Sequence, residues 1–77
     1  MHEKIKLEIG EFLSIESRKT KGPLAETDIA TYSIINANGD KVGSVVHTEH
    51  TSIKGLNNTQ RVEQRDINGV LVLDTRW

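Results

Sequence analysis

The segment with the greatest potential for chemistry is His47-Thr48-Glu49-His50, in which two imidazoles flank a carboxylate. The zinc-binding helix signature spaces its histidines four residues apart, whereas these two are three apart. On a β-strand, His47 and Glu49 would share one face while His50 points to the other. A metal-dependent enzyme would therefore need a further ligand beside His47 and Glu49, such as Asp28. We expect these side chains to be solvated polar groups of a strand, with no metal and no cofactor.

The other polar residues show no catalytic pattern. Nucleophilic catalysis needs a hydroxyl or thiol held beside a base and an orienting group, and no local spacing of Ser, Thr and His provides this arrangement. The chain has no Cys, and its 77 residues leave little room for a deep pocket. We therefore predict that the protein is not an enzyme.

A basic cluster at Arg18, Lys19 and Lys21, with Lys54 farther along the chain, indicates a different kind of function. Proteins that bind single-stranded nucleic acid combine a basic groove with aromatic side chains on which the bases stack. This chain has one Phe, one Tyr and one Trp, and its net charge of −1 gives little attraction for a polyanion. A small-barrel nucleic-acid-binding protein is thus the alternative function, although we expect the cluster to be a solvated loop.

The elements that position these residues are two predicted β-hairpins. Strand-forming residues at 27–36 and 40–51 flank Asn38-Gly39, and a smaller copy spans residues 62–77 around Asn68-Gly69. Asn-Gly between such runs is a strong hairpin signal. The two Asn-Gly pairs lie 30 residues apart, a spacing compatible with a duplicated hairpin. The sequence predicts an all-β domain of four to five antiparallel strands, built from two consecutive hairpins as a curled sheet or a small open barrel.

The charges of the strands favour a three-residue loop in each hairpin. A two-residue loop would place Asp28 opposite Glu49, whereas a loop at residues 37–39 places Asp28 opposite Thr48. A loop at residues 67–69 likewise avoids two like-charge pairs in the second hairpin. The pairs avoided are Glu63 with Asp74 and Arg61 with Arg76, and the pairs expected in the first hairpin are Ala30 with Val46, Tyr32 with Ser44 and Ile34 with Val42.

Residues outside the hairpin turns give weaker patterns. Apolar residues at the odd positions of residues 3–17 favour a strand bent at Gly10, and the alternative is an α+β fold with this segment as a helix on a four-stranded sheet. Residues 18–23 are predicted to be a polar connection and residues 52–59 a loop. The polar residues 60–66 predict an edge strand, and the apolar residues 70–73 predict an inner strand or one covered by a partner.

The last strand provides the candidate surface for binding another protein. Trp77 shares a predicted strand face with Leu71 and Leu73, and Val70 and Val72 make the strand apolar on both faces. Trp is enriched at the centres of binding interfaces. We therefore predict a non-catalytic protein-interaction module (a small regulator, inhibitor or accessory subunit) that binds a protein partner or forms a homodimer through this strand.

Length and composition set the broader expectations. Residues 1–77 support one small core and hence a single domain. There is no signal-peptide-like hydrophobic segment and no apolar run near the roughly 20 residues that a membrane helix requires. Because there is also no Cys, we expect a cytoplasmic protein without membrane association.

Overall fold

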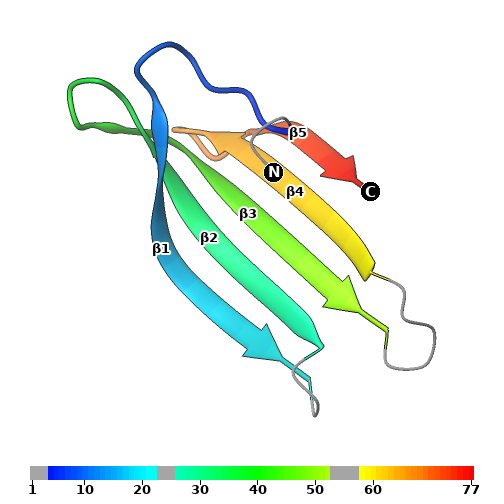
Figure 1. Cartoon of the computed structure of the whole chain (residues 1–77). Coiled ribbons are helices and arrows are strands. Elements are labelled where there is room, and N and C mark those ends of the chain that lie inside the picture. Colours follow the sequence, from blue (N-terminus) through cyan, green and yellow to red (C-terminus); the bar gives the residue numbers. More distant parts are fainter. Residues whose placement is uncertain (1–3, 23–25, 53–57) are drawn as a thin grey trace.

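The computed structural model describes residues 4–22, 26–52 and 58–77, which form one five-stranded antiparallel sheet (Figure 1). The described residues contain no α-helix, and the sheet does not close into a barrel. This confirms the all-β prediction, and the α+β alternative with a helix over residues 3–17 is wrong. The strands are β1 (Phe12–Lys21), β2 (Thr27–Ile35), β3 (Lys41–Thr51), β4 (Asn58–Asp66) and β5 (Leu71–Arg76).

The strands follow one another in the sheet in the order β1-β2-β3-β4-β5, so each pairs with its neighbours in sequence. β1 and β5 are consequently the two edges. The prediction that the polar residues 60–66 form an edge strand is wrong, because β4 lies between β3 and β5. The inner-strand interpretation of residues 70–73 is also wrong, since β5 has a neighbour on one side only.

The first 20 residues divide differently from the prediction. β1 begins at Phe12, and it continues through residues 18–21, which were expected to form a connection. The chain turns at Gly10, which has a φ of 86°. Residues 4–9 then lie across one face of the sheet instead of extending β1 (Figure 1). The physical reason is burial, because Ile5 packs against Ile34, Val45 and Val62.

A buried glutamine fixes this crossing segment to the sheet. Gln64 of β4 is buried, and its side-chain Nε2 donates to the carbonyl oxygen of Lys6 at 2.7 Å. Its Oε1 accepts from the backbone N–H of Lys6 at 2.8 Å. One side chain thus satisfies both backbone groups of a residue that has no strand partner. Such pairing is what allows an amide to be buried without a net penalty.

Both hairpins have the predicted three-residue loops. Gly39 N–H donates to the carbonyl of Asn36 and Asn36 N–H to that of Asp40, at 3.0 and 2.9 Å. In the second hairpin, Gly69 and Asp66 make the equivalent bonds, both at 3.0 Å. Gly39 and Gly69 have φ values of 86° and 82°, the left-handed conformation that closes a loop of this type.

The predicted register beyond the loops is wrong, because each hairpin has a bulge next to its loop. Ile34 pairs with Gly43 and Ile35 with Lys41, which leaves Val42 as the extra residue. Val72 is the extra residue of the second hairpin. Each bulge shifts the pairing by one residue. The resulting partners are Glu49 for Asp28, His47 for Ala30, Val45 for Tyr32, Asp74 for Glu63 and Arg76 for Arg61.

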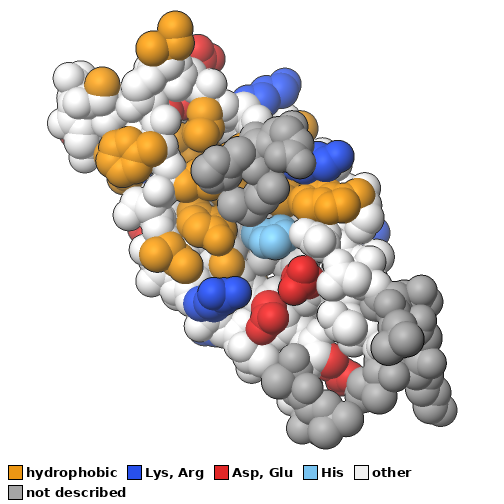
Figure 2. Space-filling view, viewed as in Figure 1, with side chains coloured by type: hydrophobic (Ala, Val, Ile, Leu, Met, Phe, Trp, Pro, Cys, Tyr) orange, Lys and Arg blue, Asp and Glu red, His pale blue; other side chains and the backbone are white. Residues whose placement is uncertain are grey.

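The hydrophobic core is small and occupies one half of one sheet face. Val45 and Val62 are fully buried, and Ile5 and Ile34 complete the buried cluster. Leu7, Leu13, Tyr32, Val42 and Leu73 pack around it. Figure 2 views this face: hydrophobic side chains gather near the hairpin loops, and polar and acidic side chains occupy the opposite half.

Candidate interaction surface at the β5 edge

The β5 edge, meaning residues 70–77, exposes several large apolar side chains. Val70, Leu71 and Val72 are 57%, 43% and 45% exposed. Ile67, in the adjoining loop, is also exposed. A sheet edge with apolar side chains and unpaired backbone groups is a ready template for another chain. This places the contact residues predicted from the sequence at the open side of the sheet.

The bulge at Val72 divides these residues between the two faces. Leu73 pairs with Gln64, whereas Leu71 pairs with Arg65, and adjacent residues of β4 point to opposite faces. Leu73 therefore lies on the core face and Leu71 on the other. The prediction that Leu71 shares a face with Leu73 and Trp77 is wrong for this reason. Period-two counting fails wherever a strand contains an extra residue.

Trp77 is held on the core face by contacts that sequence reasoning missed. Its ring stacks on that of His47, with the centroids 6.0 Å apart and the planes 9° from parallel. The Lys4 ammonium lies 5.3 Å from the centroid of the Trp77 ring, within cation–π distance. Trp77 also exchanges backbone hydrogen bonds with Gln60, at 2.9 and 3.0 Å. The indole is thus fixed in place while 38% of the residue stays exposed.

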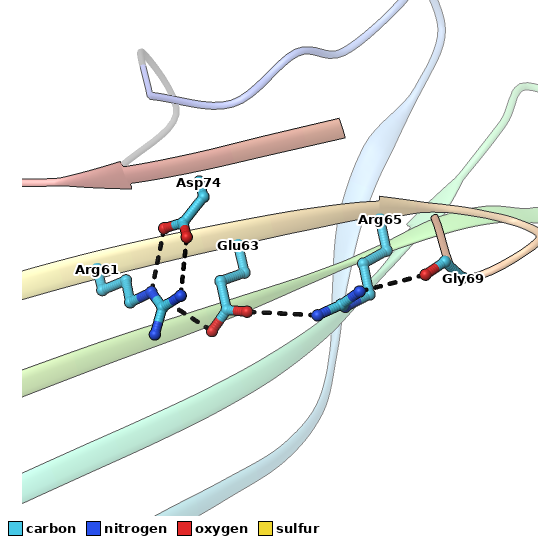
Figure 3. Close-up of polar contacts among 5 residues, drawn as sticks. All are labelled: Arg61, Glu63, Arg65, Gly69 and Asp74. Carbon is cyan, nitrogen blue, oxygen red and sulfur yellow. Dashed lines mark hydrogen bonds and ion pairs between the residues drawn. The ribbon is translucent and has the colours of Figure 1, made fainter. Parts of the chain in front are cut away.

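The opposite face of β4 and β5 carries a chain of ion pairs (Figure 3). Arg61 binds Asp74 through two hydrogen bonds, from Nε to Oδ1 at 3.0 Å and from Nη2 to Oδ2 at 2.7 Å. Glu63 lies between two arginines, 3.6 Å from Arg61 Nε and 3.4 Å from Arg65 Nη2. These contacts explain the observed register, since Arg61 reaches diagonally to Asp74 and so relieves both like-charge pairs.

The pKa values of three ionisable groups are shifted by their polar neighbours, two of them in this chain of ion pairs and one on β1. The hydrogen bond from Arg61 lowers the pKa of Asp74 below its ordinary value, and the same bond raises the pKa of Arg61. On β1, the Ser33 hydroxyl and then the Lys41 ammonium lower the pKa of Glu16. Both acids therefore stay ionised at lower pH than in the unfolded chain. Their contributions to stability are present above pH 4.5, the ordinary value for Glu, and are lost as the pH falls through the lowered values.

In β5, alternate residues direct their backbone groups away from β4. Because Trp77 and Gln60 form a hydrogen-bonded pair, Thr75 and Leu73 also direct their N–H and C=O groups toward β4. Asp74 and Arg76 direct theirs outward. These two residues have opposite charges, and Arg76 forms no ion pair with the rest of the described chain.

The basic cluster lies at the other edge of the sheet. Arg18, Lys19 and Lys21 belong to β1 and are exposed, not in a loop as expected. Arg18 pairs with Ala30 and Lys19 with Ile29, so these side chains alternate between the two faces. They do not form one basic face, and Lys54 lies outside the described residues. Charged side chains on an edge strand discourage pairing with another chain.

The His47 segment lies within β3, and its two imidazoles have separate hydrogen-bond partners on opposite faces of the sheet. His47 Nε2 lies 2.9 Å from Gln60 Oε1, and His50 Nδ1 lies 2.8 Å from the Thr27 hydroxyl on the other face. No group of three or more His, Asp or Glu side chains that could hold a metal occurs in the described part of the chain. Hollows of about 250 and 350 Å³ lie on the surface. The first is lined by Thr48, His50, Thr59, Gln60, Arg61 and Arg76, and the second includes Lys6, Glu11, Gln64 and Val72.

Taken together, fold and surface define an open antiparallel meander with two unlike edges. The β5 edge exposes Val70, Leu71 and Val72, and the β1 edge carries three cations beside its exposed apolar residues Phe12 and Ile15. In comparisons with known proteins, no family model matches the sequence, and no curated protein or solved structure matches it either. Residues 4–22, 26–52 and 58–77 contain no helix that is long and apolar enough to cross a membrane.

Proposed function

We propose that the protein is a non-catalytic interaction module, a small regulator, inhibitor or accessory subunit, and that it binds a protein partner through the β5 edge. The contact residues are Val70, Leu71, Val72, Leu73 and Trp77. The observation that carries the proposal is the combination of exposed apolar side chains with outward-facing backbone groups on one edge strand. We also propose a cytoplasmic location, consistent with a chain that contains no Cys.

The chemistry of this edge fits recognition by strand addition. In that mode, main-chain hydrogen bonds supply affinity and alternate side chains supply specificity. The β5 edge offers both, since Asp74 and Arg76 present outward-facing backbone groups and Trp77 provides a large, fixed aromatic surface. An aromatic side chain that is already ordered loses little conformational entropy on binding.

Replacing Trp77→Ala tests the proposal. The partner is captured from extracts of the source cells with the immobilised protein, identified, purified and titrated calorimetrically against both chains. We expect at least about tenfold weaker binding, because truncating an aromatic anchor at an interface costs about 2 kcal/mol or more. Self-association is measured in parallel by light scattering.

Phe12→Ala is the matched control, since Phe12 is 54% exposed on β1 at the opposite edge. It should leave binding unchanged. Circular dichroism and thermal unfolding establish that both variants fold. Equal loss of binding in the two variants, or none in either, would contradict the assignment of the contact surface to β5.

A further inference from the structure

We propose that the partner of the β5 edge is a second copy of this chain, joined by antiparallel pairing of β5 with β5 about a twofold axis at Thr75. In this arrangement Asp74 lies opposite Arg76 of the second copy, and Arg76 lies opposite its Asp74. The inference rests on the proposed function, of which it names the partner. Two open sheets would thereby become one continuous ten-stranded sheet.

The choice of edge follows from charge. Pairing β1 with its own copy would bring together two strands that each carry Arg18, Lys19 and Lys21. The one acid of β1, Glu16, cannot offset them, because it lies at the irregularity between Ile15 and Ser17 and is bound by Lys41 and Ser33. Like charges and irregular edges both oppose strand pairing. β5 carries one acid and one base among Leu71–Arg76, so two copies can match opposite charges at both positions.

The register follows from the backbone. Only Asp74 and Arg76 direct N–H and C=O groups outward in the stretch 73–77, so these must form the hydrogen-bonded pairs. Pairing Asp74 with Arg76 satisfies four donors and four acceptors and sets opposite charges against each other. Shifting the two strands by two residues in either direction places Asp74 opposite Asp74 of the second copy, or Arg76 opposite Arg76 of the second copy. Each of these alternatives opposes like charges across the axis.

The side chains on the core face fit the same register. Leu73, Thr75 and Trp77 share that face, because they pair with Gln64, Val62 and Gln60 of β4. Across the axis, Trp77 then lies opposite Leu73 of the second copy, and the two Thr75 residues meet. Aromatic and aliphatic cross-strand pairs of this kind stabilise sheets. Of the contact residues of the proposed function, Leu73 and Trp77 therefore lie within the paired stretch, whereas Val70, Leu71 and Val72 precede it and take no part in the strand pairing.

Arg76 takes no part in the ion pairs that the described residues form on this face. It lies directly opposite Arg61, which is a destabilising pair, and it forms no ion pair in the described chain. Arg61 already binds Asp74 through two hydrogen bonds, which leaves Arg76 available to the second copy. The ionised Asp74 can accept from both guanidinium groups, since a carboxylate has about four acceptor positions.

Cysteine cross-linking tests the geometry directly, since the natural chain has no Cys. Thr75→Cys places two thiols in a non-hydrogen-bonded pair across the axis, with Cα atoms about 4.5 Å apart, within the range of a disulfide. Mild oxidation should convert Thr75→Cys to a covalent dimer on non-reducing gels. Thr20→Cys, on the exposed edge β1, is the matched control and should remain monomeric on the same gels.

A charge reversal and its rescue test the register. Arg76→Asp should weaken dimerisation by at least about tenfold, because two symmetry-related pairs become repulsive together. The same change sets an acid opposite Arg61 and so leaves the single chain stable. The double variant Asp74→Arg/Arg76→Asp restores opposite charges across the axis and should recover dimerisation. It also places opposite charges against Glu63 and Arg61 within the sheet.

The outcomes separate this inference from the function on which it rests. The inference is overturned if the wild-type chain stays monomeric at about 1 mM, because its dissociation constant would then be weaker than millimolar. Dimers that Arg76→Asp leaves intact, equal cross-linking of Thr20→Cys, or open-ended polymers also overturn it. In any of these cases, a purified different partner whose binding depends on Trp77 still upholds the proposed function, and the absence of such a partner removes both.

Discussion

Gly43 lies where the backbone of β4 comes too close to β3 to leave room for a Cβ atom, and it gives the sharpest prediction for a single substitution. A Cβ atom on Gly43 would lie 2.7 Å from the carbonyl oxygen of Arg65 and 3.2 Å from Ile34 Cδ1. Because the first contact is with backbone, the two strands would have to separate. We expect Gly43→Ala to lower the free energy of unfolding by about 1–3 kcal/mol.

Urea denaturation measures this change, and Ser44→Ala is the control. Ser44 is the next residue of β3 and points to the opposite face, opposite Ser33. Its replacement should change the unfolding free energy by no more than about 0.5 kcal/mol. If Gly43→Ala is as stable as Ser44→Ala, there is room for a Cβ atom between β3 and β4, and the predicted clash with the Arg65 carbonyl does not occur.

Single residues also show where sequence reasoning reached its limit. Like charges directly opposite each other predict that Asp74 avoids Glu63 and that Arg61 avoids Arg76, yet all four residues occupy those positions. Direct opposition is only part of the geometry of a strand pair. Diagonal neighbours lie within reach of long side chains, and the Arg61–Asp74 bond uses such a diagonal. A comparison of charges can therefore exclude a strand register, and with it a loop length, only if it also considers the diagonal cross-strand neighbours.

The two hairpins are near copies at the level of backbone geometry. Asn36 Oδ1 accepts from the N–H groups of Asn38 and Asp40 at 2.9 and 3.0 Å. Asp66 Oδ1, 30 residues later, accepts from Asn68 and Val70 at the same two distances. In each hairpin the bulged residue comes three positions after the last residue of the loop. The element is therefore a loop-plus-bulge unit that two unlike strand sequences share.

This shared unit predicts matched effects of matched substitutions. Asn36→Ala and Asp66→Ala each remove two hydrogen bonds to backbone N–H groups, and we expect each to lower the unfolding free energy by about 1–2 kcal/mol. Asp66→Asn keeps an acceptor oxygen in the same place and should stay within about 0.5 kcal/mol of the natural chain. Urea denaturation of the three variants measures this, and an Asp66→Asn variant as unstable as Asp66→Ala would argue against the side-chain role.

At the level of elements, turn chemistry was predictable and strand position was not. Asn38-Gly39 and Asn68-Gly69 located both loops, and strand residues flank them as expected. Position in the sheet was inferred from polarity, which failed for β4 because Arg61 and Glu63 satisfy each other's charges inside the sheet. For β5 the apolar residues predicted an inner strand, but they lie on an open edge. The sequence therefore predicts β5 as a candidate surface, but it does not predict that β5 is an edge strand, which is what exposes its backbone and side chains.

The whole molecule is a single layer whose core depends on the segment before β1. A one-sheet protein leaves an apolar face that another element must cover. Here the cover is residues 4–9, with Ile5 in the buried cluster, Leu7 beside it and Lys6 fixed by Gln64. The period-two pattern predicts one continuous strand through residues 3–17, because the odd positions would be apolar whether the segment extends β1 or crosses the sheet. The turn at Gly10 carries Ile5 over the sheet, and no local pattern encodes which strands it meets.

Ile5 and Ile9 provide a test of this covering role within one segment. Ile5 is 9% exposed and packs in the core, whereas Ile9 is 104% exposed on the same stretch of chain. Removing the Ile5 side chain opens a cavity above Val45 and Val62, so Ile5→Ala should lower the unfolding free energy by about 2–5 kcal/mol. That is a large part of the total of about 4–11 kcal/mol expected for a domain of this size. Ile9→Ala should change it by less than about 0.5 kcal/mol. Urea denaturation of both variants decides the matter: equal effects would mean that residues 4–9 do not cover the sheet, and the core would then need another element, or the second copy, to exclude water from it.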